Sequence, residues 1–148
     1  MSALSGFLAG VSVDAQGRAL ADILAYSDAE LERRHDFIQW LFPLPDPSRA
    51  VPGSPVLSGG DIAAIRASDP ARRNLEAAAG RMLAFYEAND HWLGSHDHNH
   101  LRITRIIRSL RLLVGDSEAN GFRDSVRSLA AAAGASINPT TLAFWDAA

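Results

Sequence analysis

The sequence predicts an all-α protein, and we expect a single compact domain of about six to seven helices over residues 1–148. Three observations predict this fold class. Apolar residues recur at helical spacing in several segments, and serine, aspartate or asparagine precedes many of these segments. Glycine or proline follows them. No segment alternates polar and apolar residues with a period of two, so no strand is predicted.

The first helices are predicted from the N-terminal third of the chain. Residues 18–26 form a short helix. Ser27 followed by Glu30 is a capping box, which predicts a second helix that begins at Asp28 and is stopped by Pro43. One side of this helix is apolar at helical spacing: Leu31, Ile38, Leu41 and Phe42. A polar stripe lies beside it: Asp28, Glu32, His35 and Gln39.

A long proline-rich loop is predicted over about residues 43–60. It contains five prolines and ends at Gly59 and Gly60. Because prolines fix the backbone, we favour a stiff connection between helices over a proline-rich docking ligand. Phe37 and Trp40 are expected to pack under this loop rather than line an exposed aromatic groove.

Five further helices are predicted after the loop. Asp61 is the expected cap of the first, and Ser68 caps the second with Pro70 in its first turn. Gly115 and Gly134 end the third and the fourth. The predicted ranges are 61–66, 69–89, 98–114, 117–133 and 139–147. The third helix carries the clearest apolar stripe: Ile103, Ile106, Ile107, Leu110, Leu113 and Val114.

The composition excludes several classes of chemistry. The chain has no cysteine, and all 14 basic residues are arginine, so disulfides, thiolate metal sites and lysine chemistry are absent. The net charge of -3 disfavours non-specific nucleic-acid binding. No stretch of 18 apolar residues is present, so no membrane span is expected and the cytoplasm is the expected location. No common catalytic motif is found, which removes the common enzyme classes but leaves a small enzyme open. We favour a protein that is not an enzyme, and we expect no cofactor.

Two segments carry a resemblance to a known family. Residues 31–44, which include Arg33-Arg34-His35-Asp36-Phe37, resemble the first signature of the opioid growth factor receptor conserved domain. Residues 98–110 resemble the second signature, although the vertebrate pattern has a tyrosine at His100, a leucine at Ile107 and a lysine at Arg108. Residues 142–145 resemble the closing segment more weakly. The resemblance covers about residues 7–145.

The resemblance implies an architecture more than an activity. The vertebrate namesake of the family is described as a perinuclear and nuclear receptor for an enkephalin opioid peptide, and it restrains cell growth. It lacks the fold of the seven-helix opioid receptors. The alanine-rich, lysine-free composition suggests a short bacterial member that carries only the conserved domain, for which no opioid ligand is expected.

A first candidate site combines residues from the polar stripe of the first signature. Glu32 and His35 are three residues apart, which on a helix gives half of the motif found twice in di-iron bundles. With His98 they form a set of two histidines and one carboxylate, so any metal site would use these three residues. We favour a structural polar cluster and expect no metal.

The second signature offers an anion-binding flank. His98, Arg102 and Arg105 share one side of the predicted helix and suit a small anionic ligand or a peptide carboxylate. The alternative is that the arginines pair internally with Asp36, Glu32 or another acid. The tract from His96 to His100 resembles a metal-binding run, but capping by Asp97 and packing at the helix entry are favoured.

Three functions remain open from the sequence. The first is a non-enzymatic ligand-binding, peptide-binding or signalling domain whose groove uses six residues: Glu32, His35, Gln39, His98, Arg102 and Arg105. The second is a small enzyme or metal-binding protein with a pocket of Glu32, His35, His98 and Arg105. The third is a homodimeric interaction module that pairs through the helix 117–133, with its apolar residues Phe122, Val126 and Leu129.

Overall fold

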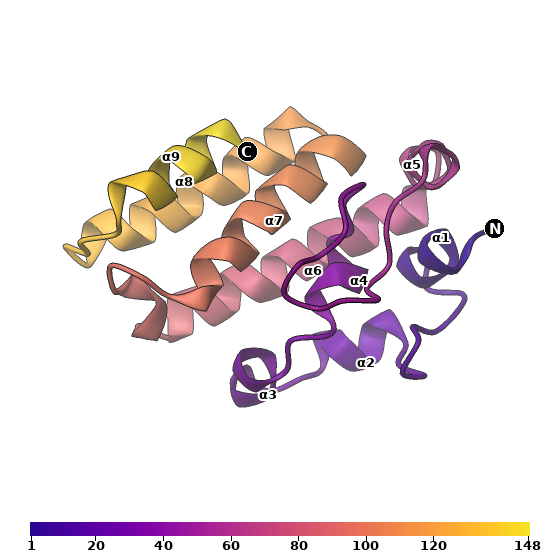
Figure 1. The fold of residues 1–148 in the computed structure, drawn as a ribbon, viewed down its shortest axis with the longest axis horizontal. Coiled ribbons are helices and arrows are strands. Elements are labelled where there is room, and N and C mark those ends of the chain that lie inside the picture. Colours follow the sequence, from indigo (N-terminus) through magenta and orange to yellow (C-terminus); the bar gives the residue numbers. More distant parts are fainter. The chain divides into compact units, whose positions relative to one another are not determined.

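A computed structural model describes all 148 residues and confirms the all-α fold class. It contains nine α-helices, one 3-10 turn and no strand (Figure 1). The elements in chain order are α1 (Ala3–Leu8), α2 (Leu20–Leu24), α3 (Asp28–Arg33), α4 (Ile38–Leu41), α5 (Gly59–Arg66), α6 (Asp69–Ala88), η1 (His91–Leu93), α7 (His98–Leu113), α8 (Asp116–Ala132) and α9 (Pro139–Ala147). None of these helices has the length and apolar character needed to cross a bilayer.

The chain divides into two compact units, Met1–Ala78 and Ala79–Ala148. The first unit holds α1 to α5 and the first half of α6. The second unit holds the rest of α6, η1 and the last three helices.

The first unit is built from short helices. α1 packs against α4 and α5, and the ring of Phe7 meets the ring of Trp40 edge-on at 5.4 Å. Phe7 is fully buried, so Trp40 contributes to the core of this unit. The sequence did not predict α1, because its capping box pairs two serines, Ser2 and Ser5, and the helix has only six residues.

The predicted continuous helix from Asp28 to Phe42 is wrong, because it is broken into α3 and α4. The capping box of Ser27 and Glu30 is present as predicted. The backbone becomes extended at Arg34 (φ -85°, ψ 139°), and helical structure resumes only at Ile38. In an unbroken helix the carbonyl of Asp36 accepts the N–H of Trp40. Here the N–H of Trp40 bonds to Phe37 instead, and the Asp36 carbonyl accepts a hydrogen bond from the Arg18 side chain.

The proline-rich loop is folded back on itself. Its base is closed by a hydrogen bond of 3.0 Å from the N–H of Leu57 to the carbonyl of Leu44. Its tip is a turn in which Ser54 N–H donates to the Val51 carbonyl and Gly53 has a φ of +83°. A positive φ at this position matches a type II turn and interrupts any polyproline helix. The loop therefore has the form of a stiff connection.

The helix that follows the loop begins earlier than predicted. α5 starts at Gly59 and is capped by Ser58, whose hydroxyl accepts the N–H of Asp61. Asp61 is the third helical residue, and its carboxylate returns the bond to the Ser58 N–H. Asp61 is therefore the partner in a capping box rather than the cap itself.

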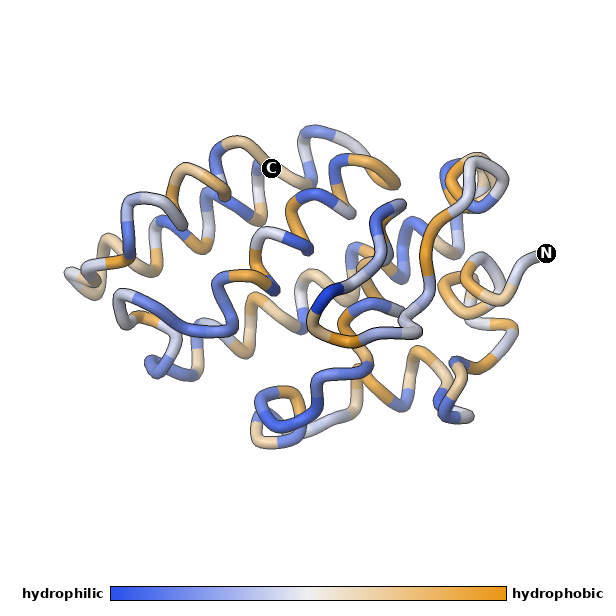
Figure 2. Tube along the Cα trace, viewed as in Figure 1, coloured by the Kyte–Doolittle hydropathy of each residue, from blue (hydrophilic) through white to orange (hydrophobic).

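The second unit follows the sequence-based predictions closely. α7 packs along α8 and also against α9, and Figure 1 shows the three helices side by side. Apolar residues recur along α7 and α8 (Figure 2). Gly115 and Gly134 end α7 and α8 with φ values of +151° and +63°. The buried face of α8 includes Phe122 and Val126. Two of the three residues proposed for homodimer formation thus belong to the buried core, and the third, Leu129, is half-buried.

Candidate functional site

The six residues predicted to form a site differ widely in exposure. Gln39 and Arg102 are buried, with 4% and 6% of their surface exposed. Glu32 and Arg105 are half-buried, and His35 and His98 are exposed. The first unit holds Glu32, His35 and Gln39, and the second holds the other three.

The break between α3 and α4 separates the polar residues of the first signature. Glu32 lies in the last turn of α3, whereas His35 lies in the turn that follows it. The two residues do not share a helix face, so the spacing that suggested half of a di-iron motif has no helical geometry to support it. No three histidine, aspartate or glutamate side chains form a group that could hold a metal ion.

Gln39 is the residue of the first signature with an unmet hydrogen-bonding capacity. It lies in α4 among residues that are almost entirely buried, and its side-chain oxygen Oε1 accepts no hydrogen bond. A buried polar atom without a partner costs about 1–3 kcal/mol relative to one that is bonded. Most buried polar atoms in native proteins have partners, so this oxygen calls for an explanation.

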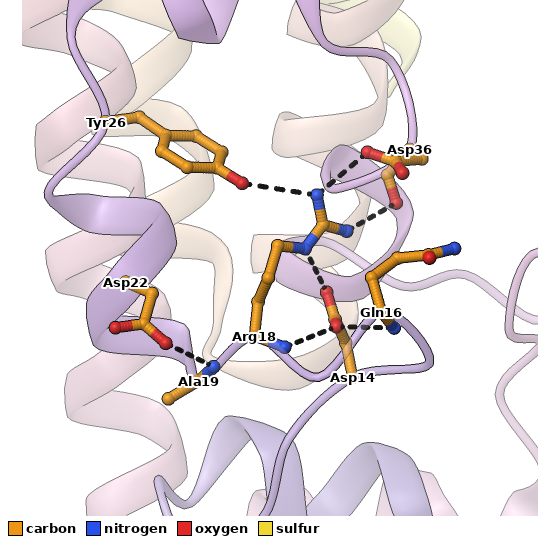
Figure 3. A network of polar contacts seen from close by, with 7 residues as sticks. All are labelled: Asp14, Gln16, Arg18, Ala19, Asp22, Tyr26 and Asp36. Atoms are coloured by element: carbon orange, nitrogen blue, oxygen red, sulfur yellow. Dashed lines mark hydrogen bonds and ion pairs between the residues drawn. The ribbon is translucent and has the colours of Figure 1, made fainter.

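A polar network that the sequence did not predict holds the turn before α4 (Figure 3). Arg18 is its centre. The Nε of Arg18 donates to Asp14 Oδ2 at 2.7 Å, and Nη1 donates to Asp36 Oδ1 at 2.9 Å. Nη1 also lies 3.4 Å from the Tyr26 hydroxyl, and Nη2 lies 3.5 Å from the Asp36 carbonyl oxygen. The arginine thereby joins the segment before α2 to the segment between α3 and α4.

The Asp14 side chain fixes the other end of the network. Its carboxylate is fully buried and accepts the backbone N–H groups of Gln16 and Arg18, each at 2.9 Å. Burial lowers the pKa of Arg18, but hydrogen bonds with Tyr26, Asp36 and Asp14 and the charge of Asp14 outweigh it, so this pKa is raised and the guanidinium remains charged. The network has a structural role, because its donors and acceptors are mutually satisfied.

Tyr26 supports the same turn through its ring. The Arg34 guanidinium lies over the ring, 5.1 Å from its centroid, and the buried ring of Phe37 meets it edge-on at 6.0 Å. A cation over an aromatic face and an edge-to-face ring pair are both stabilising contacts. Phe37 is fully buried, so it does not line an exposed aromatic groove.

Part of the network leaves a signal in the sequence. Asp14 and Arg18 are four residues apart around Gly17, whose φ is +78°, and an aspartate that bonds the backbone two residues ahead is a common turn element. Asp36 is eighteen residues from Arg18, and no local pattern indicates that pair.

In the second signature, Asp97 caps α7 as expected. Its carboxylate accepts the N–H of Asn99 at 2.8 Å, and the Nδ1 of His98 lies 3.8 Å from the same carboxylate. A carboxylate of the protein therefore already occupies the positive end of this helix, which weakens the case for an external anion there.

His100 is a packing residue rather than a ligand donor. Its Nε2 donates to the Trp92 carbonyl at 2.7 Å, since a carbonyl oxygen can only accept. The indole of Trp145 donates to the His100 carbonyl at 3.1 Å, and the two rings meet edge-on at 5.6 Å. Both tryptophans are fully buried, so His100 joins η1 and α9 to the start of α7.

Arg102 and Arg105 lie on the α7 flank where the sequence predicted them, and both are engaged in contacts of the folded chain. Asp36, one of the acids expected to pair with these arginines, pairs with Arg18.

Similarity to known proteins defines the family. The chain matches the model of the opioid growth factor receptor (OGFr) conserved region over residues 7–120, a range that holds both signatures. The chain therefore belongs to this family of all-α domains.

Two named relatives are the opioid growth factor receptors of rat and mouse. Each is 37% identical to the chain over 98 residues, which cover 54% of the chain. The same alignments cover only 17% of the rat protein and 15% of the mouse protein, so the chain spans less than a fifth of either relative. No solved structure matches the chain.

Proposed function

We propose that the chain is a non-enzymatic binding domain that takes a peptide, and that Gln39 accepts a hydrogen bond from it. The observation that carries this proposal is the buried Oε1 of Gln39, which has no partner in the folded chain. The oxygen is shielded from solvent, so a peptide donor reaches it only if the side chains that cover α4 move apart, and the bond then formed would remove the cost of leaving the oxygen unpaired. The residue lies in α4, within the residues that match the family model.

The chemistry of Gln39 favours a peptide over a small anion. A carbonyl oxygen accepts hydrogen bonds and repels an anion, whereas a peptide offers backbone N–H groups and an N-terminal ammonium. The segment 28–36 adds four carboxylates against two guanidinium groups, so its charge also favours a donor with positive character.

The names of the relatives point to the same class of ligand. The rat and mouse proteins are receptors for opioid growth factor by name. We extend to this chain only the binding of a short peptide. The joint action of Glu32, His35, Gln39, His98, Arg102 and Arg105 on one ligand remains a prediction, as do the cytoplasmic location and the bacterial source.

The proposal is tested by nuclear magnetic resonance on the whole chain. The sequence contains only two glutamines, so the side-chain amide of Gln39 has a single reference, that of the exposed Gln16. An enkephalin peptide and a set of unrelated pentapeptides are titrated in turn. We expect at least one peptide to shift the Gln39 amide signals and to leave those of Gln16 in place. If none of them does, the chain is not a peptide-binding domain of this kind.

A pair of variants separates binding from stability. Gln39→Met removes the unpaired oxygen and is expected to raise the free energy of unfolding by about 1–3 kcal/mol while it weakens peptide binding. Gln16→Met is the control and should change neither quantity. A Gln39→Met protein that binds the peptide as well as the unchanged chain would rule out Gln39 as the acceptor.

A further inference from the structure

We propose that Arg18 is a positioning residue that sets the place of Gln39, so that peptide binding depends on a side chain outside both family signatures. This inference rests on the proposed function of Gln39. Its basis is the network around Arg18 and the break that separates α3 from α4.

The local sequence of residues 28–42 favours one continuous helix. Residues 28–42 have a capping box, an apolar side at helical spacing and no proline before Pro43. Nothing in this stretch requires a break at residues 34–37. The extended backbone at Arg34 is therefore attributed to contacts from outside the local sequence.

Arg18 makes two of the contacts that oppose a continuous helix. Arg18 bonds both the carboxylate and the backbone carbonyl of Asp36, and the bond to the carbonyl replaces the one that Trp40 would make in a helix. Arg18 is itself fixed by the buried Asp14 carboxylate. A guanidinium with several donors suits this double contact, because its planar geometry holds two acceptors at once.

The break between α3 and α4 changes the position of Gln39. A helix turns by about 100° per residue, so on an unbroken helix Gln39 lies within about 40° of both Glu32 and His35. It would then belong to the same stripe as the exposed His35. In the folded chain His35 is exposed and Gln39 is 4% exposed. The turn held by Arg18 therefore moves Gln39 from the polar stripe to a buried position.

The experiment compares the whole chain with Arg18→Met, which keeps an unbranched apolar side chain and removes the donors. Carbon chemical shifts of residues 34–37 and hydrogen exchange of the Gln39 side-chain amide are measured without peptide. We expect the shifts to move toward helical values and the amide to exchange roughly tenfold faster, as expected if about 1.4 kcal/mol of protection is lost. Arg33→Met, at an exposed arginine of α3, is the control and should change neither signal.

A second variant keeps the test valid if Arg18→Met does not fold. Asp36→Ala removes the acceptor at 2.9 Å and leaves the pair of Arg18 and Asp14 intact. The same changes in shifts and exchange are expected. Asp36→Ala leaves the backbone carbonyl of residue 36 in place, so residues 34–37 that stay extended and a Gln39 that stays protected in a folded Asp36→Ala protein would show that the ion pair of Arg18 with the Asp36 carboxylate does not position Gln39.

The affinity for a peptide distinguishes a positioning role of Arg18 from a purely structural one, because a purely structural role would leave this affinity unchanged. We expect the affinity for a peptide that shifts the Gln39 amide to fall roughly tenfold in Arg18→Met, the loss of about one hydrogen bond. An unchanged affinity would overturn the inference. If no peptide binds the unchanged chain, the proposed function fails, and the measurements without peptide still decide whether Arg18 holds the turn.

Discussion

Each of the two units is stabilised internally by a different set of interactions. In the first unit, five helices have only four to eight residues, and several of them begin with a capping box. The ion pairs of Arg18 connect the segment before α2 to the turn before α4. In the second unit, two helices of 16 and 17 residues pack along apolar stripes, and buried tryptophans join them to η1 and α9. Both units bury apolar side chains. Short helices are marginal by themselves, so the first unit depends on specific polar contacts in addition to its apolar core, whereas the long helices of the second unit depend mainly on buried apolar surface.

This difference explains why similar sequence patterns predicted α7 correctly but predicted the segment 28–42 wrongly. Apolar periodicity predicts a helix well when packing of that stripe is what holds the helix in place, as in α7. In the segment 28–42 the same kind of stripe is present, but the half-buried Arg18 outweighs the local preference for a helix. The second unit should therefore respond most to the loss of rings, and the first to the loss of charges.

The largest effect is expected from Trp145→Ala in the second unit. The ring is fully buried and its Nε1 donates to the His100 carbonyl, so its loss creates a cavity and leaves an acceptor unpaired. We expect the free energy of unfolding, measured by urea denaturation, to fall by about 3–5 kcal/mol. Phe144→Ala is the control, because 58% of Phe144 is exposed. Equal losses in both variants would contradict the packing account.

In the first unit, Asp14→Ala should have the next largest effect. The substitution leaves Arg18 without its buried partner and frees two backbone N–H groups. We expect a loss of about 3 kcal/mol in the same measurement, because Arg18 loses its fully buried partner and keeps only the partly exposed Asp36, while two backbone N–H groups lose their acceptor. Glu76→Ala, at an exposed position of α6, should stay within about 0.5 kcal/mol of the unchanged chain. A loss below 1 kcal/mol in Asp14→Ala would show that the network does not hold the first unit.

Arg111 tests whether polar contacts also matter in the second unit. Its side chain donates to the Ala148 carbonyl, to Asp116 and to Asn120, which links the end of α9 to the start of α8. Arg111→Met is expected to lower the melting temperature and to cost about 1–2 kcal/mol, since two of these contacts are partly exposed to solvent. A cost as large as that of Asp14→Ala would remove the distinction between the units.

Two glycines of the second unit should give effects of opposite sign. Gly134 has a φ of +63°, which an alanine adopts only with strain, so Gly134→Ala is expected to cost about 1 kcal/mol. Gly121 lies within α8 with open space around it, so Gly121→Ala is expected to stabilise the chain by about 0.5–1 kcal/mol. Thermal denaturation of the two variants measures both. The same sign in both would show that the backbone at Gly134 is not the cause.

The smallest effect is expected from acid on Asp61 in the first unit. Burial raises the pKa of Asp61, but hydrogen bonds from Ser2 and Ser58 outweigh it, and the pKa lies below its ordinary value of 3.8. A lowered pKa contributes stability that is present above pH 3.8 and is lost as the pH falls through the folded-state value. The unchanged chain should therefore lose more stability between pH 5 and pH 2 than Asp61→Asn does. Identical acid profiles would show that Asp61 makes no such contribution.

The sequence by itself determined the fold class, the family signatures and most of the second half of the chain. The caps Ser27, Ser68, Asp97 and Asn138 act on N–H groups within the next three residues, so short windows of sequence identify them. The stripe of α7 is equally local, because helical periodicity brings its members together without any other segment.

The tertiary structure alone decided the break between α3 and α4 and the burial of Gln39. The bond that diverts the Asp36 carbonyl comes from Arg18, eighteen residues earlier, and it competes with a helix that the local sequence favours. Local rules compare a residue only with its near neighbours, so they predicted one helix with Glu32, His35 and Gln39 on one stripe. The half-buried guanidinium of Arg18, which bonds both the carboxylate and the carbonyl of Asp36, reversed that outcome, because charge-assisted hydrogen bonds outweigh the small preference of a short segment for a helix.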